Sequence, residues 1–329
     1  MIIYREQMSL GMLFQMKGSV WCKVIPYCIL NVVIGVVFWR LKHNDICDWS
    51  FSKSGHTSVG TMVSFLLVTR FSIAYHRFMD SASDMMKCYL ACRELIQHLV
   101  CLTMYETSAE AREWRFQIAR QTVCMLRLTV DYLRTKDRLE HRERVKQIPI
   151  SESEYGTIEN FEGQSGLRCP LVYTTHLRKS IAQHKETLES PLPVNYELKL
   201  YGFVLQYVAA YHDIMKLQYN PFPFPIVQMN RTLLIIWLYT LSLPLLNDVE
   251  KFEAYICIIF FATFGFLGLE LVAIELDDPF GDDDNDLAVE VNSMEVFNDI
   301  ALNMQSIDGV EAKNRLLKTI LKRSIYESV

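Results

Sequence analysis

The stretch AYICIIFFATFGFLGLELVAI, residues 254–274, decides the fold, because Glu270 is its only charged residue. A helix needs about 20 consecutive apolar residues to cross the hydrocarbon core of a bilayer. This stretch reaches that length unaided, so it is predicted to be a membrane-spanning helix.

Three further stretches, residues 24–39, 57–69 and 232–246, carry no charge but are shorter. The first reaches spanning length with the four residues before it, if the Lys23 ammonium extends towards the lipid headgroups. In a soluble protein, a short apolar helix is typical of a buried core. Because the chain also contains the long apolar stretch, the three shorter stretches are predicted to span the membrane as well. Helices inside a bundle can line water, so they need not be apolar on every side.

The sequence therefore predicts an all-α protein with four transmembrane segments and a cytosolic helical body. Residues 1–80 hold the N-terminal segment and the first two spans, and residues 81–220 form the cytosolic region. Residues 221–275 hold the third and fourth spans, and residues 276–329 an acidic loop and a C-terminal tail. Within the cytosolic region, apolar residues recur at helical spacing, whereas residues 136–169 are predicted to be a loop.

Composition agrees with a chain that is partly in lipid and partly in water. Half of the 329 residues are hydrophobic and 22% are charged. The net charge is −5 without a long basic segment, so nucleic acid is not an expected partner. Residues 1–19 lack the apolar core and cleavage site of a secretory signal. Basic residues flanking the first two spans indicate cytosolic N- and C-termini, and the membrane is either the plasma membrane or that of an organelle.

Six aspartates occupy the segment DDPFGDDDND, residues 277–286, directly after the longest apolar stretch. Carboxylates at that density repel one another unless a cation is present. Ca²⁺ takes about six to eight oxygen ligands in flexible loops, so a calcium site is one interpretation. It is not an EF-hand, because Leu287 stands where the turn glycine belongs. A solvated acidic loop without metal is the alternative.

Two other features could serve an ion path. Arg70 ends the second apolar stretch and is either an arginine at the headgroups or a cation near a path for anions. Pro223 and Pro225 prevent a regular helix at the start of the third span, which makes either a simple kink or a part of a pore. Because no catalytic motif is present, the chain is not expected to be an enzyme.

Four motifs together resemble the bestrophin family of anion channels, over about residues 15 to 300. They are KGSVWCKV (17–24), LLVTRFSIAYHRF (66–78), NPFPFPIVQ (220–228) and ELDDPFGDDDND (275–286). The resemblance implies a ring-shaped homo-oligomer, a pentamer in that family, with one central pore for chloride, bicarbonate or another anion.

The resemblance also implies which residues surround the pore. Neck-lining positions fall at Ser54, Ser58 and Met62, where animal members carry bulkier residues. A hydrophobic gate would then be weak or shifted to Met62 and Leu66. A second, cytosolic constriction is expected around residues 196–198.

By the same resemblance, calcium ligands fall at Glu275, Asp278, Asp283 and Asp286, with a backbone carbonyl near Ile2. Calcium would then gate or stabilise the channel. Two other functions remain open: a membrane-anchored metal-binding enzyme or scaffold without conductance, and a soluble helical protein with a calcium loop.

Overall fold

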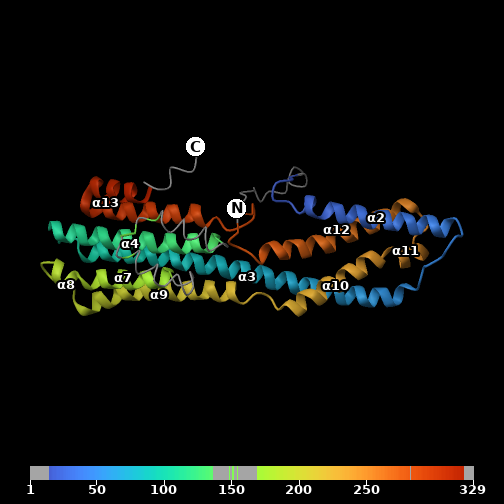
Figure 1. Cartoon of the computed structure of the whole chain (residues 1–329), viewed down its shortest axis with the longest axis horizontal. Coiled ribbons are helices and arrows are strands. Elements are labelled where there is room, and N and C mark those ends of the chain that lie inside the picture. The colour runs from blue at the N-terminus through green and yellow to red at the C-terminus, as the bar shows by residue number, and fades with distance from the viewer. Residues whose placement is uncertain are drawn as a thin grey trace. The chain divides into compact units, whose positions relative to one another are not determined.

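The structure, a computed structural model, describes residues 15–135, 148, 150–151, 154, 169–281 and 283–321. Within these residues all regular structure is helical and no strand occurs, which confirms the predicted all-α class. The helices, labelled in Figure 1, are α2 (Trp21–His43), α3 (Lys53–Leu102), α4 (Ala109–Arg134), α7 (Cys169–Ala182), α8 (His184–Thr187), α9 (Val194–Tyr219), α10 (Phe224–Thr240), α11 (Ser242–Asp248), α12 (Phe252–Leu276) and α13 (Val289–Leu321).

Four helical segments are long and apolar enough to cross a membrane: Trp21–His43, Lys53–Leu102, Phe224–Asp248 and Phe252–Leu276. Each contains one of the four apolar stretches, so the prediction of four spans is confirmed. The third span consists of α10 and α11, which meet at Leu241. Pro244 lies in the first turn of α11, and its missing N–H explains why the helix does not continue regularly through this point.

The chain divides into two compact units. The first consists of the described parts of residues 1–80, 217–279 and 283–286, and the second of the described parts of residues 81–216, 280–282 and 287–329. Helix α3 is continuous and contributes to both units.

In the first unit, α2 packs along α12, drawn in blue and orange in Figure 1. A Cβ atom at Gly35 would lie 2.7 Å from Ile259 Cδ1, so glycine allows the close approach of the two helices. The Tyr255 hydroxyl donates a hydrogen bond to the Gly35 carbonyl at 3.2 Å. Close backbone contact and a buried hydrogen bond therefore join the first and last spans.

A buried amide links three of the spans. Asn31 of α2 is fully buried, and its Nδ2 donates to the Leu238 carbonyl at 3.1 Å and to Thr263 Oγ1 at 2.8 Å. Interhelical hydrogen bonds of this kind stabilise membrane bundles by about 0.6–2 kcal/mol each. Asn31 thus fixes α2 against α10 and α12.

Helix α3 packs on α10 through a glycine and a tryptophan. Gly60 is buried against the Trp237 indole, which stacks on His56 with ring centroids 5.3 Å apart. Trp237 Nε1 donates to the His56 carbonyl at 3.1 Å. These contacts determine which face of α3 is turned towards the rest of the first unit.

The second unit has a large apolar core made by α4, α7, α9, α13 and the second part of α3. Ser108 begins α4 by accepting a hydrogen bond from the Ala111 N–H at 3.2 Å. The segment predicted as a C-terminal tail is helical as α13 as far as Leu321. The predicted loop at residues 136–169 lies almost wholly outside the described residues.

Candidate functional site

One face of α3 is exposed along its membrane-spanning part. The positions that the resemblance assigns to the neck, Ser54, Ser58 and Met62, all lie on this face. Other exposed residues continue it at spacings of three and four, which keeps them on one side of the helix. We name the whole set the α3 stripe: Ser54, Ser58, Thr61, Met62, Phe65, Thr69, Ser72 and His76.

The opposite face of α3 is buried in the first unit. Val63, Leu67 and Ala74 are at most 1% exposed there. Phe65, by contrast, is 71% exposed, although it is as apolar as the buried residues. The two faces therefore differ in what they pack against, and the α3 stripe is left open in the single chain.

Two hydroxyl groups of the α3 stripe, those of Ser58 and Thr61, bond back to their own helix. Ser58 Oγ donates to the Ser54 carbonyl at 3.1 Å, and Thr61 Oγ1 donates to the Thr57 carbonyl at 3.1 Å. Such hydroxyls can rotate to donate to a ligand at a net cost of about 1 kcal/mol for the hydrogen bond given up. The stripe thus offers weak polar contacts, and none of its members carries a fixed charge.

Phe65 is an exposed residue of the stripe that sequence reasoning did not name. Met62 and Leu66 were the expected gate positions, and the structure leaves Met62 46% exposed but Leu66 half-buried. Phe65 is the largest side chain of the stripe and lies one turn beyond Met62. Phe65 is four residues after Thr61 and three after Met62, so all three lie on one face of a helix. This spacing could have identified Phe65 from the sequence.

Arg70 is buried, unlike an arginine at the headgroups. Its side chain is 4% exposed and pairs with Asp277 after α12. The guanidinium carbon lies 4.7 Å from the centre of the Phe222 ring. Arg70 therefore joins α3, the segment before α10 and the segment after α12.

The proline-rich segment begins α10. Pro223 is the N-cap residue and Pro225 lies in the first turn, where a missing N–H costs no helical hydrogen bond. Arg77 holds the preceding segment by donating to the carbonyls of Leu217 and Asn220 at 2.7 and 2.8 Å. Both prolines are exposed.

In the second unit, the start of α9 presents exposed apolar residues at the expected cytosolic constriction. Tyr196 is 47% and Leu198 60% exposed. Glu197 between them is buried, with Lys185 Nζ at 3.1 Å and the Tyr201 hydroxyl at 3.1 Å. Burial raises the pKa of Glu197, but the hydrogen bonds from Lys185, His184 and Tyr201 outweigh it and leave that pKa below its usual value. The carboxylate therefore stays charged and fixes the first turn of α9.

The acidic segment after α12 is tied to the start of α2. Lys23 Nζ lies 2.6 Å from Glu275 Oε1. Asn285 Nδ2 donates to Glu275 Oε2 at 3.1 Å and to the Gly18 carbonyl at 3.0 Å. Asp286 is buried, and its carboxylate accepts the Asp283 N–H at 2.6 Å.

The described carboxylates do not fit a calcium cage. Calcium needs about six to eight oxygens converging on one point. Among the described residues, no group of three or more His, Cys, Asp or Glu side chains could hold a metal ion. Asp278 is half-buried, while Asp282 and the carbonyl expected near Ile2 lie outside the described residues. Calcium binding therefore stays a prediction from the resemblance.

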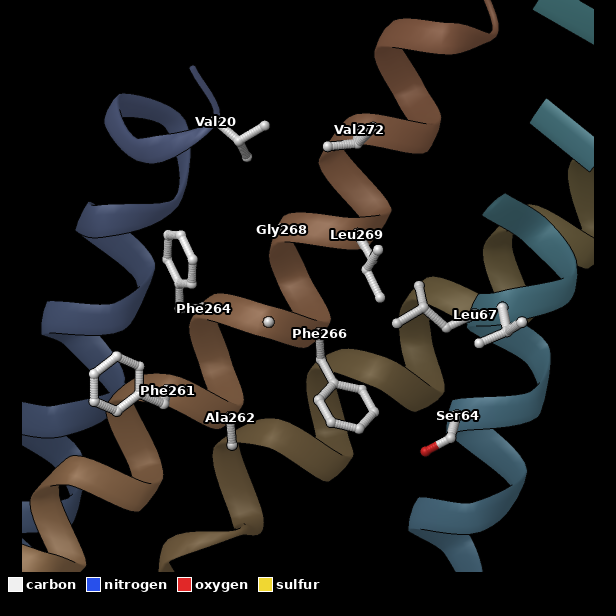
Figure 2. A pocket seen from close by; sticks show the side chains of 12 residues that line it. Val20, Ser64, Leu67, Phe261, Ala262, Phe264, Phe266, Gly268, Leu269 and Val272 are labelled. Carbon is white, nitrogen blue, oxygen red and sulfur yellow. The ribbon is translucent and has the colours of Figure 1, made fainter. Parts of the chain in front are cut away.

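An apolar groove of about 600 Å³ lies between α3, α12 and Val20, the residue before α2. Figure 2 shows side chains of α3 and α12 around it, including Leu67, Phe264 and Leu269, with Val20 at its end. Ser64 is its one hydroxyl, and that hydroxyl donates to the Gly60 carbonyl at 2.8 Å. The lining holds no charged group, so the groove suits neither catalysis nor an ion path.

The fold and site define a four-span helical membrane protein with an open polar helix face and an acidic segment after the last span. Residues 1–301 match the family model described as bacterial/fungal bestrophin protein. The chain belongs to the bestrophin family.

Relatives and solved structures agree with this membership. The voltage-dependent anion channel-forming protein YneE of Escherichia coli O157:H7 is 23% identical over 314 residues, covering 90% of this chain and 92% of that protein. YneE of Escherichia coli strain K12 is 23% identical over 306 residues, with the same coverage. A bacterial bestrophin homologue from Klebsiella pneumoniae, phased with zinc, matches with a TM-score of 0.72 and 17% identity over 85% of this chain and 98% of that one. A single-residue variant of that homologue gives 0.74 and 18% over 86% and 99%. Family membership and the four spans make this chain an integral membrane protein.

Proposed function

We propose that the chain forms an anion channel in which the α3 stripe lines the pore of a ring of identical subunits. The observation that carries the proposal is the exposure of that stripe. Polar side chains on a spanning helix face water or protein rather than lipid, because lipid offers them no partner. Several copies arranged around an axis would place their stripes around one water-filled path.

The relatives support conduction of anions, since YneE is named as a voltage-dependent anion channel-forming protein. The bestrophin resemblance supports a pentamer. A channel built this way needs no catalytic group, which agrees with the expectation that the chain is not an enzyme.

Selectivity would come from weak contacts. Ser54, Ser58 and Thr61 can turn their hydroxyl hydrogens towards an anion, and the ring edge of Phe65 carries partial positive charge. Weak sites favour anions that lose water easily and let them leave again. Phe65 is the bulkiest member of the stripe, so the pore would be narrowest at this residue.

The proposed conduction does not depend on calcium. Lys23 and Asn285 occupy both carboxylate oxygens of Glu275. The predicted carbonyl ligand near Ile2 remains an expectation from the resemblance.

Recording from the purified full chain in planar bilayers tests the function. A salt gradient should give a reversal potential with the sign for chloride over sodium. Phe65→Ala should raise the single-channel conductance, because it removes the largest ring from the path. Val59→Ala is the matched control, since Val59 is 40% exposed on the same helix but lies about 120° around the helix axis from Phe65.

Absence of conductance, a reversal potential with the cation sign, or equal effects of both substitutions would refute the pore assignment. The alternative of a membrane-anchored metal enzyme predicts metal-dependent turnover without current. The same purified protein separates the two.

A further inference from the structure

The acidic segment after α12 is neutralised in part by cations of the chain itself. Lys23 pairs with Glu275 at 2.6 Å, and Arg70 pairs with Asp277. Lys17 lies 3.7 Å from Asp284. These three basic residues come from parts of the sequence more than 200 positions away.

We propose that Lys23 is a tethered cation that closes the segment after α12 onto the start of α2, so that this clasp forms without a divalent metal. The closure itself does not depend on conduction. Its regulatory consequence, a channel whose opening does not require calcium, rests on the proposed function.

Glu275 has no free carboxylate oxygen. Oε1 accepts from Lys23 and Oε2 accepts from Asn285. The Glu275 side chain is 13% exposed and the Lys23 side chain is 52% exposed, so the carboxylate is shielded from water while the ammonium is partly solvated. A divalent ion could reach Glu275 only by displacing the ammonium.

The same contact includes the backbone before α2. The Asn285 amide also donates to the Gly18 carbonyl at 3.0 Å. Gly18 has a φ of 68°, a left-handed conformation that glycine adopts without strain and that turns the chain there. One amide and one ammonium therefore bridge the two segments by direct bonds.

Other carboxylates of the segment after α12 also have partners within the chain. Asp284 pairs with a second lysine, since Lys17 Nζ lies 3.7 Å from Asp284 Oδ1. Asp286 is already bonded to the Asp283 N–H, which curls the segment into a tight turn. The carboxylates of this segment therefore meet ammonium groups of the chain itself, Glu275 that of Lys23 and Asp284 that of Lys17.

A tethered cation also has an advantage in concentration. Groups joined by a short connection meet at an effective concentration in the millimolar range or above. The Lys23 ammonium is therefore always present at the clasp, whereas a free metal must compete with it. We expect stability and current to be insensitive to calcium.

The experiment compares thermal unfolding of the full-length protein, followed by tryptophan fluorescence, in 1 mM Ca²⁺ (about the weak end of protein calcium sites) and in EGTA. Wild type should give the same Tm in both. Lys23→Met keeps the apolar stem but removes the charge, so its Tm in EGTA should fall by about 2–4 °C. Calcium should restore part of this loss, because the carboxylates then lack their cation.

Lys42→Met is the matched control. Lys42 is on the same helix, but it bonds the Leu246 carbonyl at 3.0 Å and Asn247 at the other end. Its Tm should show no response to calcium. Should Lys23→Met not fold, Glu275→Gln is the second variant, since it keeps the Asn285 contact and should remain insensitive to calcium.

Stoichiometric calcium binding to wild type by calorimetry, or a higher wild-type Tm in calcium, would overturn the proposal. An unchanged Tm of Lys23→Met in EGTA would overturn it as well. These measurements need no current, so a protein that behaves as expected here but does not conduct would sink the channel assignment alone.

Discussion

Removing the positive charge of Arg115 should destabilise the second unit strongly. Arg115 of α4 and Asp308 of α13 are 1% and 3% exposed and form two parallel bonds, Nε to Oδ2 at 3.0 Å and Nη2 to Oδ1 at 2.5 Å. Arg115 Nη1 also donates to the Glu106 carbonyl at 3.0 Å. The substitution Arg115→Met leaves the Asp308 carboxylate buried.

The expected loss follows from this geometry. Breaking a buried ion pair by removing one partner costs about 3–5 kcal/mol, because a charge remains in a medium of low dielectric. Arg112 does not replace the lost partner, since its Nε is 4.0 Å from Asp308 and its side chain is 57% exposed. We expect the Tm to fall by on the order of 10 °C.

Thermal unfolding of the purified protein in detergent measures this loss. Arg93→Met is the matched control, because Arg93 also pairs with α13, through Asp299, but the two side chains are 29% and 43% exposed. Solvent screens that pair, so its loss should cost less than about 1 kcal/mol. Arg115→Met combined with Asp308→Leu should recover most of the stability, because no unpaired charge is then buried. Equal Tm values for Arg115→Met and Arg93→Met would refute this reasoning.

Two further predictions concern packing and pH. Gly60→Ala places a Cβ 2.7 Å from Trp237 Nε1, so it should destabilise the protein by about 1–3 kcal/mol in thermal unfolding. Gly55→Ala on the same helix is the control, because its Cβ meets nothing within 4 Å and its stability should not change. Burial opposes ionisation of Glu154, but the hydrogen bonds from Arg120 and the Ser151 N–H outweigh it and lower its pKa to about 2. Its contribution to stability is therefore complete above pH 4.5, its ordinary pKa, and disappears as the pH falls through about 2. The Tm difference between wild type and Glu154→Gln should shrink on going from pH 6 to pH 2.5 (about 2 units above and below the ordinary pKa), and a difference that does not change would contradict this assignment.

Sequence reasoning identified the elements whose signal is local. The length of the apolar stretches was enough to predict four spans, because a helix in lipid must bond its own backbone over the whole bilayer. The prolines at 223 and 225 marked the start of the third span, since each lacks an N–H. The helical tail was missed because α13 mixes polar and apolar residues, and it is bent at Gly309, where φ is 84°.

The face of α3 that is open could not be derived from hydropathy. Phe65 and Leu67 are both apolar, yet one is 71% and the other 1% exposed. In a soluble helix the apolar side faces the core, but a helix in a membrane can have apolar residues on every side. Register relative to a known family supplied Ser54, Ser58 and Met62, and the structure added Phe65.

The partners of the charged residues were decided only by tertiary structure. Glu275 and Lys23 are 252 positions apart, and Asp277 and Arg70 are 207 apart. The sequence showed that the carboxylates of residues 275–286 need cations nearby. It did not show whether a metal ion or a lysine side chain supplies the positive charge. By itself the sequence determined a four-span helical membrane protein, because hydrophobic length is a local property. Which residues neutralise which charges depends on how helices from distant parts of the chain pack together, and only the folded structure contains that information.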